Sequence, residues 1–199
     1  MYSQYEEERF ILEALKDIPQ GRLLDLGASM PTKFSNSRRL IELGWEAVLV
    51  DCSPDAIKAL ATEYAGVWPR VKVVQAAVDV KERWVDINLT EDFVTTFDAA
   101  THAKWKGQVP YYGRVRTRTI CVFEILRLFP ASDFLNIDLE GQSPAVFCEI
   151  MGLLNPRVDS LPTCICVEYD DRYSDVMNAA ERNGYSLRYK NGTNVVLAR

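Results

Sequence analysis

The 199-residue chain has one histidine, five cysteines without a C-x-x-C pair, and no apolar run long enough to span a bilayer. A single histidine argues against a zinc site built from several histidines. An odd number of unpaired cysteines is typical of reduced thiols. The acidic, polar segment 1–10 does not resemble a secretory signal, so we expect a cytoplasmic protein. The net charge of −5 argues against a general duplex-DNA binder.

What the sequence does contain is an apolar run that ends in a glycine turn. Residues 23–26 (Leu-Leu-Asp-Leu) predict a strand buried on both faces, and Gly27 allows a tight turn close to a ligand. A second apolar run, 47–50, ends in Asp51, which is 24 positions beyond Gly27. A carboxylate about 20 residues after such a glycine holds the ribose hydroxyls of nucleotide cofactors. The pattern therefore indicates an adenosine-containing cofactor.

The glycine content of the turn distinguishes among these cofactors. A dinucleotide site needs G-x-G-x-x-G and a P-loop needs G-x-x-x-x-G-K-[ST], and residues 27–33 (Gly-Ala-Ser-Met-Pro-Thr-Lys) fit neither pattern. S-adenosylmethionine carries adenine and ribose but no phosphate, so one glycine can suffice. We therefore expect S-adenosylmethionine rather than NAD or ATP.

Alternating strand and helix signals predict an α/β fold with a doubly wound, Rossmann-like sheet. Asn191-Gly192 between two strand-like runs predicts a C-terminal hairpin, which makes the last strand antiparallel. This ending suits the seven-stranded methyltransferase sheet. We expect one domain over 1–199 that begins with a helix within 1–20. Strands are expected at 22–26, 46–50, 71–75, 133–141, 163–167, 185–190 and 194–197.

Residues 80–133 interrupt this rhythm and are interpreted as an insert or lid. Residues 90–118 within it interleave aromatic and basic side chains and would form a lid or acceptor wall. Arg114, Arg116 and Arg118 alternate along a strand-like run. They indicate either a solvated strand face or a site for an anionic acceptor, such as an acidic sugar or single-stranded nucleic acid.

Four motifs together resemble the FkbM family of S-adenosylmethionine-dependent methyltransferases. They are 24–29 (Leu-Asp-Leu-Gly-Ala-Ser), 76–78 (Ala-Ala-Val), 137–141 (Ile-Asp-Leu-Glu-Gly) and 167–168 (Val-Glu). The resemblance spans roughly 22–199 and implies methyl transfer to a hydroxyl of a small molecule, sugar or lipid-linked glycan. The chain departs from the family at Ser29 (usually Asn), at 30–33, where a glycine is missing, and at Asn136 (usually Lys).

The candidate cofactor residues cluster at the expected strand ends. Asp25 would orient the glycine loop and the cofactor amine, Asp51 would bind ribose, and Asp138 would contact the ammonium group. Cys52 and Ala77 would flank adenine. The full predicted set is Asp25, Gly27, Ala28, Ser29, Asp51, Cys52, Ala77 and Asp138.

Three residues are candidates for catalytic roles at the hydroxyl group of the methyl acceptor. Glu140 would orient or deprotonate the hydroxyl, Glu168 could face the same crevice, and His102 is a competing base. Helix capping is the alternative role for Asp138 and Glu140. We predict no metal, although three carboxylates could also hold a divalent cation.

Two other function classes remain open at this point. One is a non-catalytic adenosine-binding module, and the other is an NAD-linked oxidoreductase. The expected partner is a small-molecule or glycan acceptor, with no duplex nucleic acid and no membrane span. The sequence leaves a homodimer open.

Overall fold

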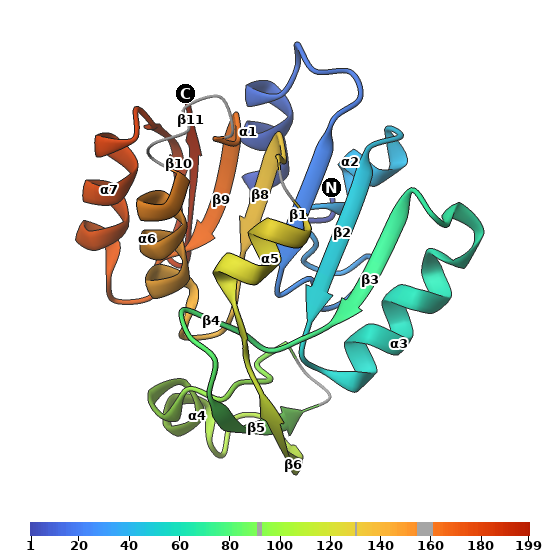
Figure 1. The fold of residues 1–199 in the computed structure, drawn as a ribbon, viewed down its shortest axis with the longest axis vertical. Helices are drawn as coiled ribbons and strands as arrows, with labels where there is room; N and C mark the ends of the chain where they lie inside the picture. Colours follow the sequence, from blue (N-terminus) through green and yellow to red (C-terminus); the bar gives the residue numbers. More distant parts are fainter. Residues whose placement is uncertain (91–92, 130, 155–160) are drawn as a thin grey trace.

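A seven-stranded sheet forms the centre of the molecule, seen in a computed structural model that describes residues 1–90, 93–129, 131–154 and 161–199 (Figure 1). The strand order is β10-β11-β9-β8-β1-β2-β3, with β11 antiparallel to both of its neighbours and the other pairs parallel. This order confirms the predicted sheet and its closing hairpin. The strands are β1 (Arg22–Leu26), β2 (Glu46–Asp51), β3 (Val71–Gln75), β8 (Phe134–Ile137), β9 (Cys164–Glu168), β10 (Ser186–Lys190) and β11 (Asn194–Ala198).

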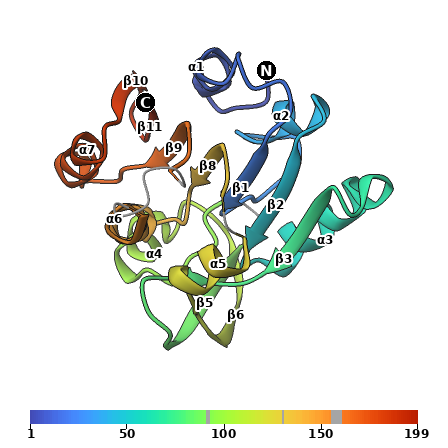
Figure 2. The ribbon, with the colours of Figure 1, turned by 45° about the horizontal axis from the view of Figure 1, so that its top comes forward.

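Helices cover both faces of the sheet, which explains why the central strands are apolar throughout (Figure 2). One face packs against α1 (Glu7–Ala14), α2 (Arg38–Glu42) and α3 (Pro54–Glu63). The other packs against α5 (Val122–Leu128), α6 (Ser143–Leu154) and α7 (Tyr173–Arg182). Two apolar layers therefore hold the strands in register and fix the strand ends in space.

The first helix is shorter than the sequence pattern suggests. Ser3 Oγ accepts a hydrogen bond from Glu8 N at 2.8 Å, but the helix itself starts at Glu7. Glu7, in the first turn of this helix, is fully buried. Its Oε1 accepts hydrogen bonds from Asn191 Nδ2 at 2.6 Å and Asn194 Nδ2 at 3.0 Å. The carboxylate therefore ties α1 to the closing hairpin.

Part of the predicted insert 80–133, residues 84–90 and 93–118, adds a second, smaller layer beyond the carboxyl ends of the sheet strands, at the bottom of Figure 1, whereas α5 lies on a face of the sheet. It contains the antiparallel pair β5 (Trp84–Thr90) and β6 (Tyr111–Arg118), with α4 (Ala99–Trp105) between them. A short parallel pair, β4 (Val78–Asp79) with β7 (Ile120–Cys121), joins this layer to the sheet. The sequence pattern predicted the strand-like run at residues 114–118, which lies in β6, but not α4.

Among the residues that the structure describes, no helix has both the length and the apolar character needed to cross a membrane.

Candidate active site

A cavity of about 410 Å³ opens at the carboxyl ends of the sheet strands, beneath the insert. All eight predicted cofactor residues line it: Asp25, Gly27, Ala28, Ser29, Asp51, Cys52, Ala77 and Asp138. Glu140 and Glu168 line it as well, whereas His102 is not part of its wall as described. The fold thus gathers side chains that lie up to 143 positions apart, from Asp25 to Glu168.

Gly27 allows the ends of β1 and β8 to touch. Its φ is +88°, and a Cβ atom there would lie 1.7 Å from the carbonyl oxygen of Asp138. Gly27 N and Ala28 N both donate to Val50 O, at 2.8 and 3.1 Å. Any side chain at position 27 would therefore separate the glycine loop from the carboxylate turn that follows β8.

Asp51 ends β2 and is 9% exposed. Its Oδ2 accepts from Ser29 N at 2.8 Å, and its Oδ1 accepts from Ser53 N at 2.7 Å. Each carboxylate oxygen has two acceptor positions, so both can still receive a ligand hydroxyl. Burial raises the pKa of this carboxyl group, and the backbone N–H groups oppose that rise. The residue has the position and the spare acceptors that a ribose ligand needs.

Both carboxylate oxygens of Asp25 accept hydrogen bonds from protein groups. Asp25 is 2% exposed and accepts hydrogen bonds from Ser37 Oγ and, at 2.8 Å, from Asn136 Nδ2. Burial raises its pKa to about 6, against the effect of these two donors. Asp25 therefore ties β1 to β8 and to the segment before α2, and Asn136 supplies one of its two donors.

The carboxylates of Asp138, Glu140 and Glu168 form a cluster in which one oxygen from each residue lies within 4.8 Å of the other two. A turn after β8, with Glu140 at φ +47°, brings them together, rather than the extended strand that the sequence suggests. Ser143 Oγ donates to Glu168 Oε2 at 3.0 Å. The oxygens could chelate a divalent cation or bind an organic cation.

Burial and mutual repulsion raise the pKa of every member of this cluster. Burial, followed by the charge of Glu140, raises the pKa of Asp138 to about 8. Burial and the charge of Glu168 raise the pKa of Glu140, and burial and the charge of Asp138 raise that of Glu168. These carboxyl groups therefore hold their protons to higher pH than ordinary carboxyl groups do, and their carboxylates are correspondingly stronger bases.

The whole cavity is strongly acidic. Lys104 of α4 is the one Lys or Arg among the lining residues that the structure describes, against seven carboxylates. These are Asp25, Asp51, Asp55, Asp138, Glu140, Glu168 and Asp170. The charge of Lys104 opposes the rise in the pKa of Glu140 and of Asp170. Such a cavity favours cationic or neutral ligands and disfavours phosphates.

The insert is attached directly to the carboxylate turn. Thr96 Oγ1 donates to Glu140 O at 2.7 Å, and Gln142 Nε2 donates to Asp98 Oδ2 at 3.3 Å. Asp98 also caps α4, since its Oδ1 accepts from Thr101 N at 2.8 Å. The segment after β5 and the start of α4 therefore form one wall of the cavity.

His102 lies on α4 with its ring 4.5 Å from the ring of Tyr111. Its Nδ1 is buried and has no hydrogen-bond partner among the described residues. The structure does not bring this ring into the cavity wall, so its role as a base remains a prediction.

The three arginines of β6 lie on the outer face of the insert. The register pairs them with Asn88, Asp86 and Trp84 of β5, opposite to the buried face that carries Val85, Ile87 and Leu89. Arg114 Nε donates to Asn88 Oδ1 at 3.1 Å, Arg118 pairs with Glu82, and Arg116 lies 5.9 Å from the centre of the Trp84 ring. This basic stretch therefore does not face the cavity.

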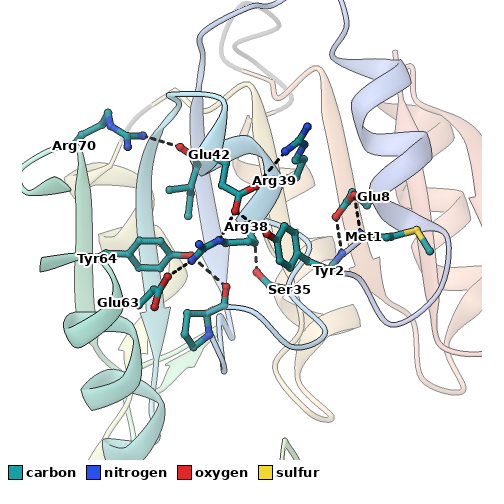
Figure 3. Close-up of polar contacts among 12 residues, drawn as sticks. Met1, Tyr2, Glu8, Ser35, Arg38, Arg39, Glu42, Glu63, Tyr64 and Arg70 are labelled. Atoms are coloured by element: carbon teal, nitrogen blue, oxygen red, sulfur yellow. Dashed lines mark hydrogen bonds and ion pairs between the residues drawn. The ribbon is translucent and has the colours of Figure 1, made fainter. Parts of the chain in front are cut away.

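A second network, outside the cavity, holds the segment between Gly27 and α2 (Figure 3). Arg38 Nε contacts Glu42 Oε1 at 3.0 Å, its guanidinium group also pairs with Glu63, and its backbone N donates to Ser35 Oγ at 3.1 Å. Tyr2 Oη donates to Glu42 Oε1 at 2.7 Å. Arg38 thus fastens α2, α3 and the N-terminal segment to one another.

Several cavity residues were not predicted from the sequence. Asn36 and Asn136 form a buried hydrogen-bonded pair, and Gln4 and Tyr5 reach the cavity from the N-terminal segment. Asp170 is the clearest omission, because the acidic run after β9 signalled it directly. Asn36 lies between two serines, a pattern that indicates helix capping, so its burial beside β8 had no local signal.

Comparison with known proteins supports the fold. No protein-family model and no curated sequence matches the chain. The structure of precorrin-6Y C5,15-methyltransferase from Geobacter metallireducens aligns with a TM-score of 0.51 and 12% identity, over 96% of this chain and 86% of that one. A proposed RNA methyltransferase from Pyrococcus horikoshii aligns with a TM-score of 0.50 and 9% identity, over 97% and 80%. The chain therefore has the Rossmann-like methyltransferase fold.

Proposed function

We propose that the protein is an S-adenosylmethionine-dependent methyltransferase of the FkbM type. It would methylate a hydroxyl group of a small molecule, sugar or lipid-linked glycan. The observation that carries this proposal is the placement of Gly27, Asp51 and the Asp138–Glu140–Glu168 cluster around one cavity. The methyltransferase fold and the motif resemblance support the same activity.

The chemistry of the cavity fits this cofactor better than NAD. When bound, S-adenosylmethionine supplies an electrophilic methyl group on a positively charged sulfonium. The sulfonium and ammonium charges would favour the ionised form of the lining carboxyl groups, which would stabilise both charges, whereas the same groups would repel a pyrophosphate. Asp51 would accept hydrogen bonds from the ribose hydroxyls. Cys52 and Ala77, just after β2 and β3, would pack against the adenine.

The same charges limit the acceptor. An anionic acceptor would have to enter past the carboxylates of Glu140, Glu168 and Asp170, with Lys104 as the opposing charge. The β6 arginines cannot offset this repulsion directly, because they lie on the outer face. An uncharged or cationic hydroxyl compound is therefore favoured over a phosphorylated one.

Each carboxylate has a separate role in this proposal. Asp138 would contact the cofactor ammonium group, and Glu168, held by Ser143 Oγ, lies beside it. The Glu140 carboxylate has no such donor among the described residues and would accept the proton of the attacking hydroxyl, which its raised pKa favours. Residues 93–109 of the insert would act as a lid that excludes water from the reacting groups.

A transfer assay with methyl-labelled S-adenosylmethionine tests this function. We expect label in neutral hydroxyl acceptors, such as sugars and glycans, and little in their phosphorylated forms. Binding of the cofactor without transfer to any acceptor class would favour the non-catalytic adenosine-binding module. Failure to bind the cofactor, combined with binding of NAD, would favour the oxidoreductase.

A further inference from the structure

The chain takes an unusual path between the glycine loop and α2. After Gly27, residues 30–34 form neither helix nor strand, and Phe34 has φ +58°. Ser35 and Asn36, just before α2, line the cavity together with Met30 and Phe34. This segment stands where the glycine motif of the FkbM family has its second glycine. Another group must therefore hold the part of the ligand that lies there.

Asn36 occupies that place with a fixed orientation. Its Nδ2 donates to Asn136 Oδ1 at 3.0 Å and to Cys166 Sγ at 3.4 Å. Asn136 in turn donates to Asp25 Oδ1 at 2.8 Å, so its own amide cannot turn over. Exchanging the oxygen and nitrogen of Asn36 would set two amide oxygens against each other. The hydrogen bonds therefore determine where Asn36 Oδ1 points.

That oxygen has no donor. Asn36 is 6% exposed and lines the cavity, yet its Oδ1 is buried without a hydrogen-bond partner among the described residues. A buried carbonyl oxygen without a donor is costly and is rarely left so in a folded protein. The unfilled acceptor indicates a ligand group that brings an N–H or O–H.

We propose that Asn36 Oδ1 accepts a hydrogen bond from the α-ammonium group of the cofactor's methionine end. This inference rests on the function proposed above. The adenosine end is assigned to Asp51 at the end of β2, which leaves the methionine end for the side of β1 and β8. There Asn36 lies with Asp25 and Asn136, and the ammonium group has three N–H donors to offer.

The test compares two ligands that differ only at this group. Isothermal titration calorimetry measures the binding of S-adenosylhomocysteine and of its deaminated analogue, which keeps the carboxylate. We expect the wild type to prefer the amine by about 10- to 100-fold, the worth of a charge-assisted hydrogen bond. Asn36→Leu should narrow the preference by weakening the amine ligand alone, and the preference that remains comes from Asp138. Asn36→Asp keeps an oxygen and adds charge, so it should retain the preference, although its carboxylate can no longer donate to Asn136 Oδ1.

The outcomes separate the proposals. A wild type that binds neither ligand contradicts the proposed function itself. Equal binding of both ligands by the wild type overturns the roles of Asn36 and Asp138 at the ammonium group, but not the binding of the cofactor. An unchanged preference in Asn36→Leu, as expected if a buried water fills the site, or an equal loss for both ligands, also overturns the role of Asn36. If Asn36→Leu does not fold, loss of the preference in Asn36→Asp decides against the proposal. Asn183→Leu, outside the cavity, is the control that should behave as wild type.

Discussion

Gly141 and Asp98 are in direct contact, and this contact joins the insert to the carboxylate cluster. A Cβ atom on Gly141 would lie 2.7 Å from Asp98 Cβ and 2.5 Å from Thr101 Oγ1. The glycine also has φ +103°, a region that other residues rarely adopt. The last residue of the Asp-x-Glu-Gly motif therefore has a packing role, because it allows α4 to lie against the turn that carries Glu140.

Gly141→Ala should loosen the insert. The added methyl group forces α4 away and strains the backbone, at a cost of more than about 1 kcal/mol. We expect faster trypsin cleavage after Lys104 and Lys106 on α4 and the turn that follows it. Gly113→Ala is a matched control, since a Cβ there meets only Leu89 Cδ1, at 3.9 Å. Equal cleavage of the two variants would show that the contact does not hold the insert.

Glu140→Gln should separate chemistry from binding. It keeps the shape of the side chain and removes the base, so turnover should fall by about 10²–10⁴-fold. Cofactor affinity should change by no more than about threefold, because Asp138 and Asp51 remain. The measurement is steady-state kinetics with an identified acceptor, together with calorimetry. Normal turnover in this variant and none in His102→Ala would assign the proton to the lid instead.

Asp51→Ala should weaken cofactor binding. It removes the carboxylate expected to hold the ribose hydroxyls and the acceptor for Ser29 N and Ser53 N. Loss of such charge-assisted hydrogen bonds costs roughly 1.5–3 kcal/mol. Calorimetry with S-adenosylhomocysteine measures the effect. Asp55→Ala, a neighbour on the cavity wall at the start of α3, serves as the control. Unchanged affinity in Asp51→Ala would remove this residue from the site.

Stability without ligand should fall as the pH rises toward 8. The pKa of Asp138 is about 8 in the folded protein against an ordinary value of 3.8. Between these two pKa values the folded state keeps a proton that the unfolded state loses. The stabilisation is complete below pH 3.8, the ordinary pKa, and is lost as the pH rises toward 8, the pKa in the folded protein. One such group changes the free energy of unfolding by at most about 1.4 kcal/mol per pH unit. Urea titrations across this range should show the decline, and Asp138→Asn should reduce it. Stability that increases over the same range would contradict the assignment.

The sheet was predictable because its signals are local. The apolar run before Gly27, the carboxylates after β8 and Asn191-Gly192 each specify a structure within a few residues, and topology then places the strand ends together. The cofactor side of the cavity followed from that placement alone.

The position of the insert and the part of the cavity around Asn36 depend instead on contacts between distant segments. No local pattern pairs Asn36 with Asn136, 100 positions away, or Gly141 with Asp98. For the same reason the arginines of β6 left two interpretations open. Their orientation depends on which face of the hairpin packs against Ala77 and Cys52, and only the folded structure shows that.

The most direct test of the central claim is a thermal-shift comparison of S-adenosylhomocysteine, NAD and ATP with the purified chain. At a concentration one hundred times its dissociation constant, a ligand stabilises the folded state by about 2.7 kcal/mol. We expect S-adenosylhomocysteine to raise the melting temperature accordingly, and NAD and ATP, repelled by the acidic cavity, to leave it unchanged. Stabilisation by NAD or ATP but not by S-adenosylhomocysteine would contradict the account.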